Sequence, residues 1–435
     1  MEKCLNKFNF ELTTPYKKIG VGVSGGMDSM CLLDNLMKGR KTGGYEVVVI
    51  NIDHHLRETS KRDSDFVKRF CDKHNLQLVF QDVDVIEYSK IHKSSIEQSA
   101  RELRYGVFER CINDKTCDVI ALGHHKNDNV ETVLINLFKG AALKGVCGIA
   151  ESRANFIRPM IEVTRAEIEK YINENSIEYV TDETNFNDDF ERNFVRNQIL
   201  PLIATKFPNA INAIDSFSKL ATRDESLLNS QAEKIVHFSN SPYIFIDDFK
   251  NEAVCTRAIL LCLKALGAYK DVYNVNIMDV IKLANKLENG SRVDILDDIS
   301  AFRDYDKITF ARRIDLTSDV ELPIKFGDFQ LSVGRLSIKM EEKFKKVANP
   351  TYIDFDKLPN NAIIRTRRSG DIFLRDGGSK SLKDFLIDKK IPNRERDELL
   401  VIASENNVLA VIGIECGRTL KIDDNSKNIM SLSIN

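Results

Sequence analysis

Lys18-Ile19-Gly20-Val21-Gly22-Val23-Ser24-Gly25-Gly26-Met27-Asp28-Ser29-Met30 (residues 18–30) joins a short apolar run to a segment with helical periodicity. Residues 20–23 are typical of a buried strand. After Met27 the apolar residues recur at helical spacing, at Cys31, Leu32, Leu33 and Leu36. The glycine and serine residues between the two segments are therefore predicted to form a strand-to-helix turn.

A turn of this composition is suited to binding an anion. Gly25 and Gly26 allow the backbone to approach a ligand closely, and the helix that begins near Met27 adds the positive end of its dipole. Ser24 and Ser29 supply hydroxyl donors. A plain turn without a ligand has the same composition, so both interpretations stay open at this point.

Asp28 indicates what kind of anion the turn would bind. A carboxylate next to a polyphosphate is repelled unless a divalent cation lies between them, so Asp28 suggests Mg²⁺. The lysine of a G-x-x-x-x-G-K-[ST] loop is missing from this stretch. The turn is therefore not a Walker A loop.

The whole chain has 435 residues, a formal net charge of −2 and 43% hydrophobic residues. This length predicts two or three domains. No apolar run is long enough to span a bilayer, and residues 1–18 lack a signal-peptide pattern, so we expect a cytoplasmic protein without a membrane partner. The nine cysteines include no C-x-x-C pair, which argues against a zinc ribbon or a redox dithiol.

Alternating strand and helix patterns follow the first helix. Residues 45–52 form a β-branched run typical of a strand covered on both faces, residues 61–74 have helical spacing, and residues 76–80 resemble another strand. This order predicts a doubly wound, mostly parallel α/β sheet. Asp53-His54-His55-Leu56-Arg57 would lie at the carboxyl end of its strand, where such sheets bind ligands.

Residues 94–110 are predicted to form a helix with one polar face, on which Glu97, Arg101, Arg104 and Tyr105 recur at three- and four-residue steps. A solvated face with an internal ion pair is one interpretation. Guanidinium groups directed at phosphate or nucleic acid are the other.

A further buried strand, residues 118–123, leads into His124-His125-Lys126-Asn127-Asp128-Asn129-Val130-Glu131-Thr132. On a helix that includes His124, the residues His124, Asp128 and Thr132 are spaced i, i+4 and i+8, and Glu131 lies one step around. Imidazole, carboxylate and hydroxyl would then face the same cleft. A histidine that only caps the helix is the alternative, and the H-E-x-x-H zinc pattern is absent.

Ser-Gly-Gly-x-Asp-Ser at residues 24–29 resembles the signature of the PP-loop ATP pyrophosphatase superfamily. Gly-His-His-x-x-Asp-x-x-Glu-Thr at residues 123–132 resembles the tRNA(Ile)-lysidine synthetase family within it. Further matches follow in the expected order, at residues 51–57, Glu97, Ala100-Arg101, Arg104-Tyr105, Arg158-Pro159-Met160, Asp182-Glu183-Thr184-Asn185, Arg192-Asn193 and Arg196. The Rossmann-like PP-loop fold is implied by the same resemblance.

The chain departs from the family pattern in three places. Lys139-Gly140-Ala141-Ala142 stands where the family commonly has Arg-Gly-Ser-Gly, Asn129 stands in place of Gln, and Ser95 in place of Asn. Lysine keeps the positive charge of arginine but not its bidentate geometry toward phosphate.

The second half of the chain carries fewer motifs. Residues 203–238 and 253–287 have helical spacing, and residues 292–310 alternate like strands after the Asn289-Gly290 turn. We expect a catalytic domain at residues 1–212, a mainly helical, tRNA-facing middle domain at 213–335 and a small α+β domain at 349–435.

Residues 365–396 are predicted to bind nucleic acid. Basic residues outnumber acidic ones there by about two to one, with Gly and Phe interleaved, in a chain that is otherwise near neutral. A solvated charged face is the alternative. The segment also resembles the carboxyl-terminal tRNA-binding domain of the same family.

The resemblance implies a ligase that joins free L-lysine to C2 of the wobble cytidine in the CAU anticodon of tRNA(Ile). ATP would adenylate the base, and AMP and pyrophosphate would be released. ATP would bind at Ser24, Gly25, Gly26, Met27, Asp28 and Ser29, with Mg²⁺ on Asp28. The expected catalytic residues are Asp28, His124, Asp128 and Arg101. The expected substrate-binding residues are Asp128, Glu131, Lys139, Arg192, Arg196, Arg367, Arg368 and Lys383.

Other functions stay open on the sequence. A PP-loop tRNA thiolase would need sulfur-carrying cysteines, which the missing C-x-x-C argues against. A small-molecule PP-loop ligase would have no use for the basic terminal segment, and a non-catalytic RNA- or nucleotide-binding protein would not need Asp28, His124 and Asp128. A homodimer is compatible with the resemblance but is not required by it.

Overall fold

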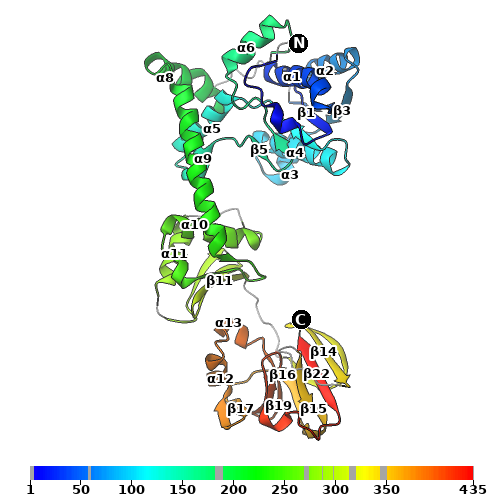
Figure 1. Ribbon diagram of the computed structural model, residues 1–435, viewed down its shortest axis with the longest axis vertical. Helices are drawn as coiled ribbons and strands as arrows, with labels where there is room; N and C mark the ends of the chain where they lie inside the picture. The colour runs from blue at the N-terminus through cyan, green and yellow to red at the C-terminus, as the bar shows by residue number, and fades with distance from the viewer. Residues whose placement is uncertain are drawn as a thin grey trace. The chain divides into compact units, whose positions relative to one another are not determined.

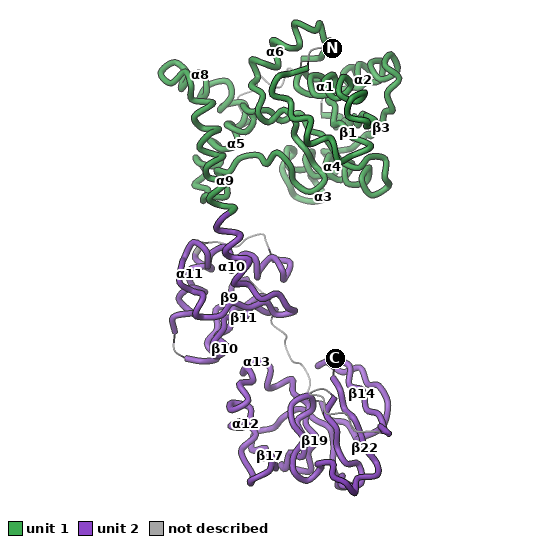
Figure 2. The backbone as a smooth tube through the Cα atoms, viewed as in Figure 1, with its two compact units in different colours: residues 1–226 green, residues 227–435 purple. Residues whose placement is uncertain are grey.

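The computed structural model describes residues 4–56, 60–181, 190–268, 274–286, 288–296, 298–312, 320–342 and 350–434 (Figure 1). Of the motif residues above, Arg57 and Asp182-Glu183-Thr184-Asn185 lie outside these ranges. The chain divides into two compact units, Met1–Ser226 and Leu227–Asn435 (Figure 2). Among the described residues, every helix is too short or too polar to traverse a bilayer.

A six-stranded, mostly parallel sheet of order β3-β2-β1-β4-β6-β5 forms the centre of the first unit. Its central strand β1 pairs in parallel with β2 and β4, and only β5 runs antiparallel. The predicted doubly wound α/β fold is confirmed. The strands are β1 (Lys18–Gly22), β2 (Glu46–Asp53), β3 (Gln77–Asp82), β4 (Val119–Ala121), β5 (Ser152–Arg153) and β6 (Phe156–Ile157).

Helices cover both faces of this sheet. Val49 of β2 packs in a core with helices α1 and α6, whereas the next residue, Ile50, packs with Phe108 of α4 on the opposite face. This alternation explains why residues 47–50 of β2 are all apolar. The helices are α1 (Met27–Gly43), α2 (Ser60–Lys73), α3 (Val85–His92), α4 (Ile96–Asn113), α5 (Lys126–Phe138), α6 (Arg165–Glu174), α7 (Glu191–Phe194), α8 (Leu200–Lys206) and α9 (Ala210–Ile235).

The second unit begins with an antiparallel sheet of order β7-β8-β11-β10-β9, packed with two helices around a core that includes Ile259, Val280 and Phe310. Its helices are α10 (Glu252–Ala265) and α11 (Asn274–Ala284). Its strands are β7 (Val236–His237), β8 (Tyr243–Phe245), β9 (Arg292–Leu296), β10 (Ile299–Asp304) and β11 (Lys307–Arg312).

Two further sheets make up the rest of this unit. One has the order β12-β16-β19-β20-β17-β18, with β21 on β20, and the other the order β13-β14-β22-β15. Because β12 pairs with β16 and β14 pairs with β22, residues from 321 onward belong to these sheets. The elements are β12 (Glu321–Pro323), β13 (Gly327–Leu331), β14 (Gly334–Glu341), β15 (Thr351–Asp354), β16 (Ile363–Thr366), β17 (Ile372–Arg375), β18 (Gly378–Ser381), α12 (Leu382–Asp388), α13 (Asn393–Arg396), β19 (Leu400–Ser404), β20 (Asn407–Val411), β21 (Glu415–Cys416) and β22 (Ile429–Ile434).

Arg365 of β16 is the largest fully buried side chain of this part, at 1% exposed. Its guanidinium donates to both carboxylate oxygens of Asp371, at 2.9 and 2.7 Å, and to the carbonyls of Thr366 and Glu405. Asp371 also accepts the N–H of Arg368 at 2.7 Å. This buried pair fixes the loop that carries Arg367 and Arg368.

We expect Asp371→Asn to destabilise the C-terminal sheets by about 3–5 kcal/mol, because the substitution leaves the buried Arg365 charge without a counter-ion. Differential scanning calorimetry of the full chain should show one transition at lower temperature. Asp376→Asn, at an exposed aspartate of the same segment, is the matched control and should leave that transition in place. An unshifted transition in Asp371→Asn would contradict this role of the pair.

Candidate active site

The turn between β1 and α1 has the geometry of an anion-binding loop. Gly25 has a φ of +87°, and a Cβ there would lie 2.8 Å from Val180 Cγ2, so both conformation and space favour glycine. Gly26 is the N-cap of α1, and no side chain caps this helix. The N–H groups of its first turn are therefore free to bind an anion.

Two hydroxyls line this loop. The Ser24 and Ser29 oxygens lie 3.4 Å apart, and Ser29 donates to the carbonyl of Gly26 at 2.8 Å. Met27 packs its side chain against the core, so only its backbone faces the loop. The predicted nucleotide-binding residues thus form one continuous turn.

The carboxyl end of β4 meets this turn at Gly123. A Cβ on Gly123 would lie 3.3 Å from the carbonyl oxygen of Asp28 and 3.5 Å from the nitrogen of Ser29. This close approach brings the residues after β4 beside the first turn of α1. His125 Nε2 lies 3.7 Å from Asp28 Oδ1.

Helix α5 starts later than the sequence indicates. Its first residue is Lys126 and its N-cap is His125, whose Nδ1 accepts the N–H of Asp128 at 3.3 Å. Asp128 completes a capping box by accepting the N–H of His125 at 3.0 Å. The prediction that His124 shares a helical face with Asp128 and Thr132 is therefore wrong for His124, which precedes the helix.

The two adjacent histidines differ in their electrostatics. Burial, together with the charges of Arg158, Arg192 and Arg101, lowers the pKa of His124 to about 4, although Asp128 opposes this shift. Burial alone would lower the pKa of His125, but the carboxylates of Asp128 and Asp28 raise it. Because Nδ1 of His125 accepts the helix cap, its proton resides on Nε2.

Four buried polar atoms around this centre lack a hydrogen-bond partner among the described residues. They are Asp28 Oδ1, His124 Nδ1, His125 Nε2 and Arg158 Nε. Buried polar atoms are normally paired, so this concentration of unpaired atoms indicates a ligand site. A carboxylate oxygen at the phosphate-binding turn also fits a Mg²⁺ ion that is shared with a nucleotide.

Arginine side chains of α4 and neighbouring elements surround the histidines. Arg101 lies over the ring of Tyr105, at 4.9 Å from its centroid. Desolvation, followed by the positive charge of Arg101, lowers the pKa of Arg104, and Arg192 adds to the effect. Arg158 is 7% exposed and donates to the carbonyl of Ala150 at 2.8 Å. This concentration of positive charge is suited to phosphate groups.

Two carboxylates of α5 lie opposite two arginines that come from α7 and from the π-helix after it (Val195–Ile199). Arg196 contacts both oxygens of Glu131, at 2.7 and 2.8 Å, and Asp128 Oδ1 at 2.9 Å. Arg192 donates to the hydroxyl of Thr132 at 3.0 Å. His125 and His124 hold the pKa of Asp128 below its usual range, against burial and with help from Arg196.

A pocket of about 690 Å³ adjoins these carboxylates, and its lining includes Asn127, Glu131, Arg165 and Arg196. This volume is in the range of small-molecule sites. Lys139 at the end of α5 forms an exposed ion pair with Glu191, at 2.5 Å. The structure thus brings Asp28, Asp128, Glu131, Arg192 and Arg196 together in one region.

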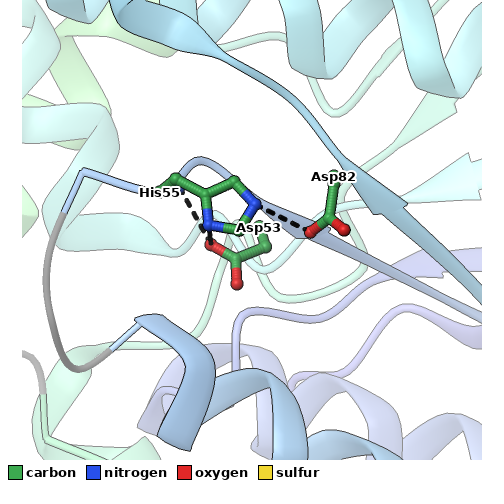
Figure 3. Close-up of side chains that lie close together, drawn as sticks. All are labelled: Asp53, His55 and Asp82. Atoms are coloured by element: carbon green, nitrogen blue, oxygen red, sulfur yellow. Dashed lines mark hydrogen bonds and ion pairs between the residues drawn. The ribbon is translucent and has the colours of Figure 1, made fainter.

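A second group of potential metal ligands lies at the ends of β2 and β3. Figure 3 shows the imidazole of His55 between the carboxylates of Asp53 and Asp82. His55 Nε2 is 2.9 Å from Asp82 Oδ1, and the N–H of His55 donates to Asp53 Oδ1 at 2.9 Å. Since these ligand atoms already bind one another, the group is explained as a mutual ion-pair cluster.

The basic C-terminal segment is less positive than its composition suggests. Arg365 and Arg396 are buried, Arg367 pairs with Asp397 at 2.5 Å, and Arg368 pairs with Glu321. Lys383 on α12 is exposed. The segment therefore offers fewer unpaired charges to a nucleic acid than the two-to-one excess of basic residues implies.

Sequence reasoning missed two residues of this site. His125 was passed over in favour of His124, although it lies between the two aspartates. Arg158 belongs to a quoted motif but received no role, and its burial beside the histidines became visible only in three dimensions. The pairing of two histidines after a buried strand was the signal for His125.

Known proteins match both the N-terminal and the C-terminal parts of this chain. Residues 1–203 match the model of a PP-loop domain, and residues 362–433 match a TilS substrate C-terminal domain. A tRNA(Ile)-lysidine synthase from Clostridium tetani is 30% identical over 96% of this chain and 94% of its own length. Another from Caldanaerobacter subterraneus is 28% identical over 95% and 92% of the two chains, and one from Clostridioides difficile is 29% identical over 99% and 98%.

The match therefore extends from the phosphate-binding turn through the C-terminal sheets, and the chain covers nearly the full length of these relatives. By its PP-loop, its site geometry and this likeness, the chain belongs to the tRNA(Ile)-lysidine synthase family of ATP-dependent tRNA-modifying enzymes.

Proposed function

We propose that the site between α1 and α5 carries out lysidine formation in two steps that share His125. The observation that carries this proposal is the position of His125 Nε2, which lies 3.7 Å from Asp28 on the phosphate-binding side and 3.6 Å from Asp128 on the other side. Asp28 belongs to the nucleotide-binding turn and Asp128 to the helix that faces the pocket. Activation of the base and attack by lysine can then occur at adjacent places.

In the first step, ATP binds with its β and γ phosphates on the turn of residues 24–29. The oxygen at C2 of the wobble cytidine attacks the α phosphate, pyrophosphate leaves, and C2 becomes bonded to a good leaving group. Arg101, Arg158 and Arg192 are positioned around His124 to balance the negative charge that develops. Mg²⁺, if held by Asp28, would shield the phosphates from this carboxylate.

In the second step, the side-chain amine of free lysine attacks C2 and AMP leaves. This amine has an ordinary pKa near 10.4, so at pH 7 only about one molecule in a few thousand is unprotonated. We infer that Asp128 and Glu131 hold the ammonium group and that Arg196, which now contacts both, yields part of its contacts to it. His124 is neutral at pH 7 because its pKa is low, so it adds no positive charge that would repel the ammonium. The proton that the amine loses as it attacks can pass to Asp128, which holds it.

The tRNA would also contact the second unit. We place Arg367 and Arg368, whose loop the buried Arg365–Asp371 pair orders, on the tRNA-binding face. The exposed Lys383 of α12 is placed on the same face. Lys139 would contribute at the catalytic unit after it exchanges its Glu191 partner for phosphate. The CAU anticodon of tRNA(Ile) and a homodimeric assembly are kept as predictions from the family resemblance.

Asp28→Asn should lower tRNA-dependent pyrophosphate release from ATP by at least about 100-fold, because the turn loses the charge that would hold Mg²⁺. Binding of tRNA, measured by filter retention, should stay within about twofold, since a carboxylate makes no favourable contact with the RNA phosphates. Loss of tRNA binding would instead mean that Asp28 is structural. Asp72→Asn, at an exposed aspartate of α2, serves as the control.

Asp128→Ala should leave pyrophosphate release intact when lysine is omitted, but should slow lysine incorporation by about 10²–10⁴-fold. The expected cause is the loss of a group that holds the ammonium near the activated carbon. Single-turnover assays with labelled lysine separate the two steps. Incorporation at the wild-type rate, with an unchanged KM for lysine, would refute the assigned role.

Replacing Arg367, Arg368 and Lys383 by Gln should weaken tRNA binding and flatten its dependence on salt by about one unit of slope per lost phosphate contact. Among the single variants, the salt slope should fall less for Arg367→Gln and Arg368→Gln than for Lys383→Gln, because both arginines already have carboxylate partners. Lys264→Gln, on α10, removes one positive charge and is the control for the single variant Lys383→Gln. An unaltered slope in the triple variant would count against this surface.

A further inference from the structure

Helix α5 has a second buried polar face, which the two-step reaction does not use. Asn129, at 4% exposed, donates from Nδ2 to Asp215 Oδ1 at 3.0 Å and to the hydroxyl of Ser218 at 3.1 Å, both on α9. Its Oδ1 accepts the N–H of Ile149 at 2.7 Å. A Cβ on Gly148 would lie 2.0 Å from this oxygen, so the loop is shaped around the Asn129 amide.

A closed ring of four charges surrounds the same contact. Asp215 is 3% exposed, and its Oδ2 lies 3.6 Å from the ammonium of Lys126 and 2.9 Å from that of Lys219. Glu162 completes the ring at 3.9 Å from Lys126 and 2.6 Å from Lys219. Two cations and two anions balance, which permits the burial of Lys126 at the positive end of a helix.

These contacts hold the first turn of α5 from the side opposite the active site. Lys126 and Asn129 bind α9, and Asn127 Oδ1 accepts the N–H of Arg165 at 3.0 Å. Asp128 is the one residue of this turn whose side chain faces His125 and Arg196. The position of its carboxylate is therefore set by the contacts that its neighbours make.

We propose that Asp215 is a positioning residue for the lysine step: through Asn129 and Lys126 it fixes the turn of α5 that presents Asp128 and Glu131. This inference rests on the proposed function, since it needs those carboxylates to act on lysine. Displacements of about 1 Å at a reacting group are known to cost about 100-fold in rate. The phosphate-binding turn belongs to α1, so adenylation should tolerate a shift of α5 better than lysine transfer does.

The direct test is Asp215→Asn, which keeps the shape but removes the charge. An amide there keeps one acceptor oxygen, so its NH2 must face either the Nδ2 donor of Asn129 or the two ammonium groups, and the turn should relax. We expect lysine transfer to fall by about 10- to 100-fold, or the KM for lysine to rise by that factor. Pyrophosphate release without lysine should change less than about threefold.

Lys219→Gln is the second variant, because Lys219 is half-exposed and its loss should not prevent folding. It should show the same selective effect in weaker form. Asp224→Asn, at an exposed aspartate of the same helix, should change neither step. Two results for Asp215→Asn would overturn the proposal. One is an equal loss of rate in both half-reactions together with a lowered Tm, which would mean that Asp215 has only a structural role. The other is wild-type kinetics in both half-reactions.

The two proposals fail in different ways. If Asp128→Ala spares lysine transfer, the assignment of the carboxylates is wrong, and the role of Asp215 falls with it. If Asp128→Ala blocks lysine transfer while Asp215→Asn does not slow it, only the positioning role is wrong. A selective loss in both variants supports both proposals.

Discussion

The buried imidazole of His125 is the interaction on which the site depends. Its Nδ1 caps α5 and its Nε2 faces two aspartates from different elements, so one ring joins the phosphate-binding turn to the helix that carries the carboxylates. The helix cap uses Nδ1 as an acceptor, whereas the two carboxylates face Nε2 on the other side of the ring. Only the tautomer with a bare Nδ1 and a proton on Nε2 satisfies both.

Charge is segregated around this ring. Burial and the charges of Arg158, Arg192 and Arg101 keep His124 neutral, whereas Asp28 and Asp128 face Nε2 of His125 and favour a proton on that nitrogen. Neighbours in sequence therefore have opposite properties because their surroundings differ. On the far side of α5, Asp215 and Glu162 balance Lys126 and Lys219, so α5 is held by ionic contacts on both faces.

The sheet and the phosphate-binding turn could be predicted because they depend on local patterns: β-branched runs mark β2, and glycines beside a helix start mark the loop. The start of α5 could not be predicted, because histidine is not among the preferred N-cap residues. The position of His125 also involves its contact with Asp28, which lies 97 residues earlier in the chain. The composition of residues 365–396 predicted more positive surface charge than the fold presents. Arg365, for example, is buried and paired with Asp371, and this pairing becomes visible only in the folded sheets. Ser95, a departure from the family pattern, is explained simply as the N-cap of α4.

The tautomer and charge of His125 test the central claim most directly. Nitrogen NMR of the protein labelled with ¹⁵N-histidine, assigned with His124→Gln and His125→Gln variants, reports the proton on each ring nitrogen across pH. The account predicts that Nε2 of His125 is protonated at pH 7 while His124 stays neutral until the pH falls to about 4. A proton on Nδ1 of His125 with a bare Nε2, or a His124 that titrates near its ordinary pKa, would contradict it.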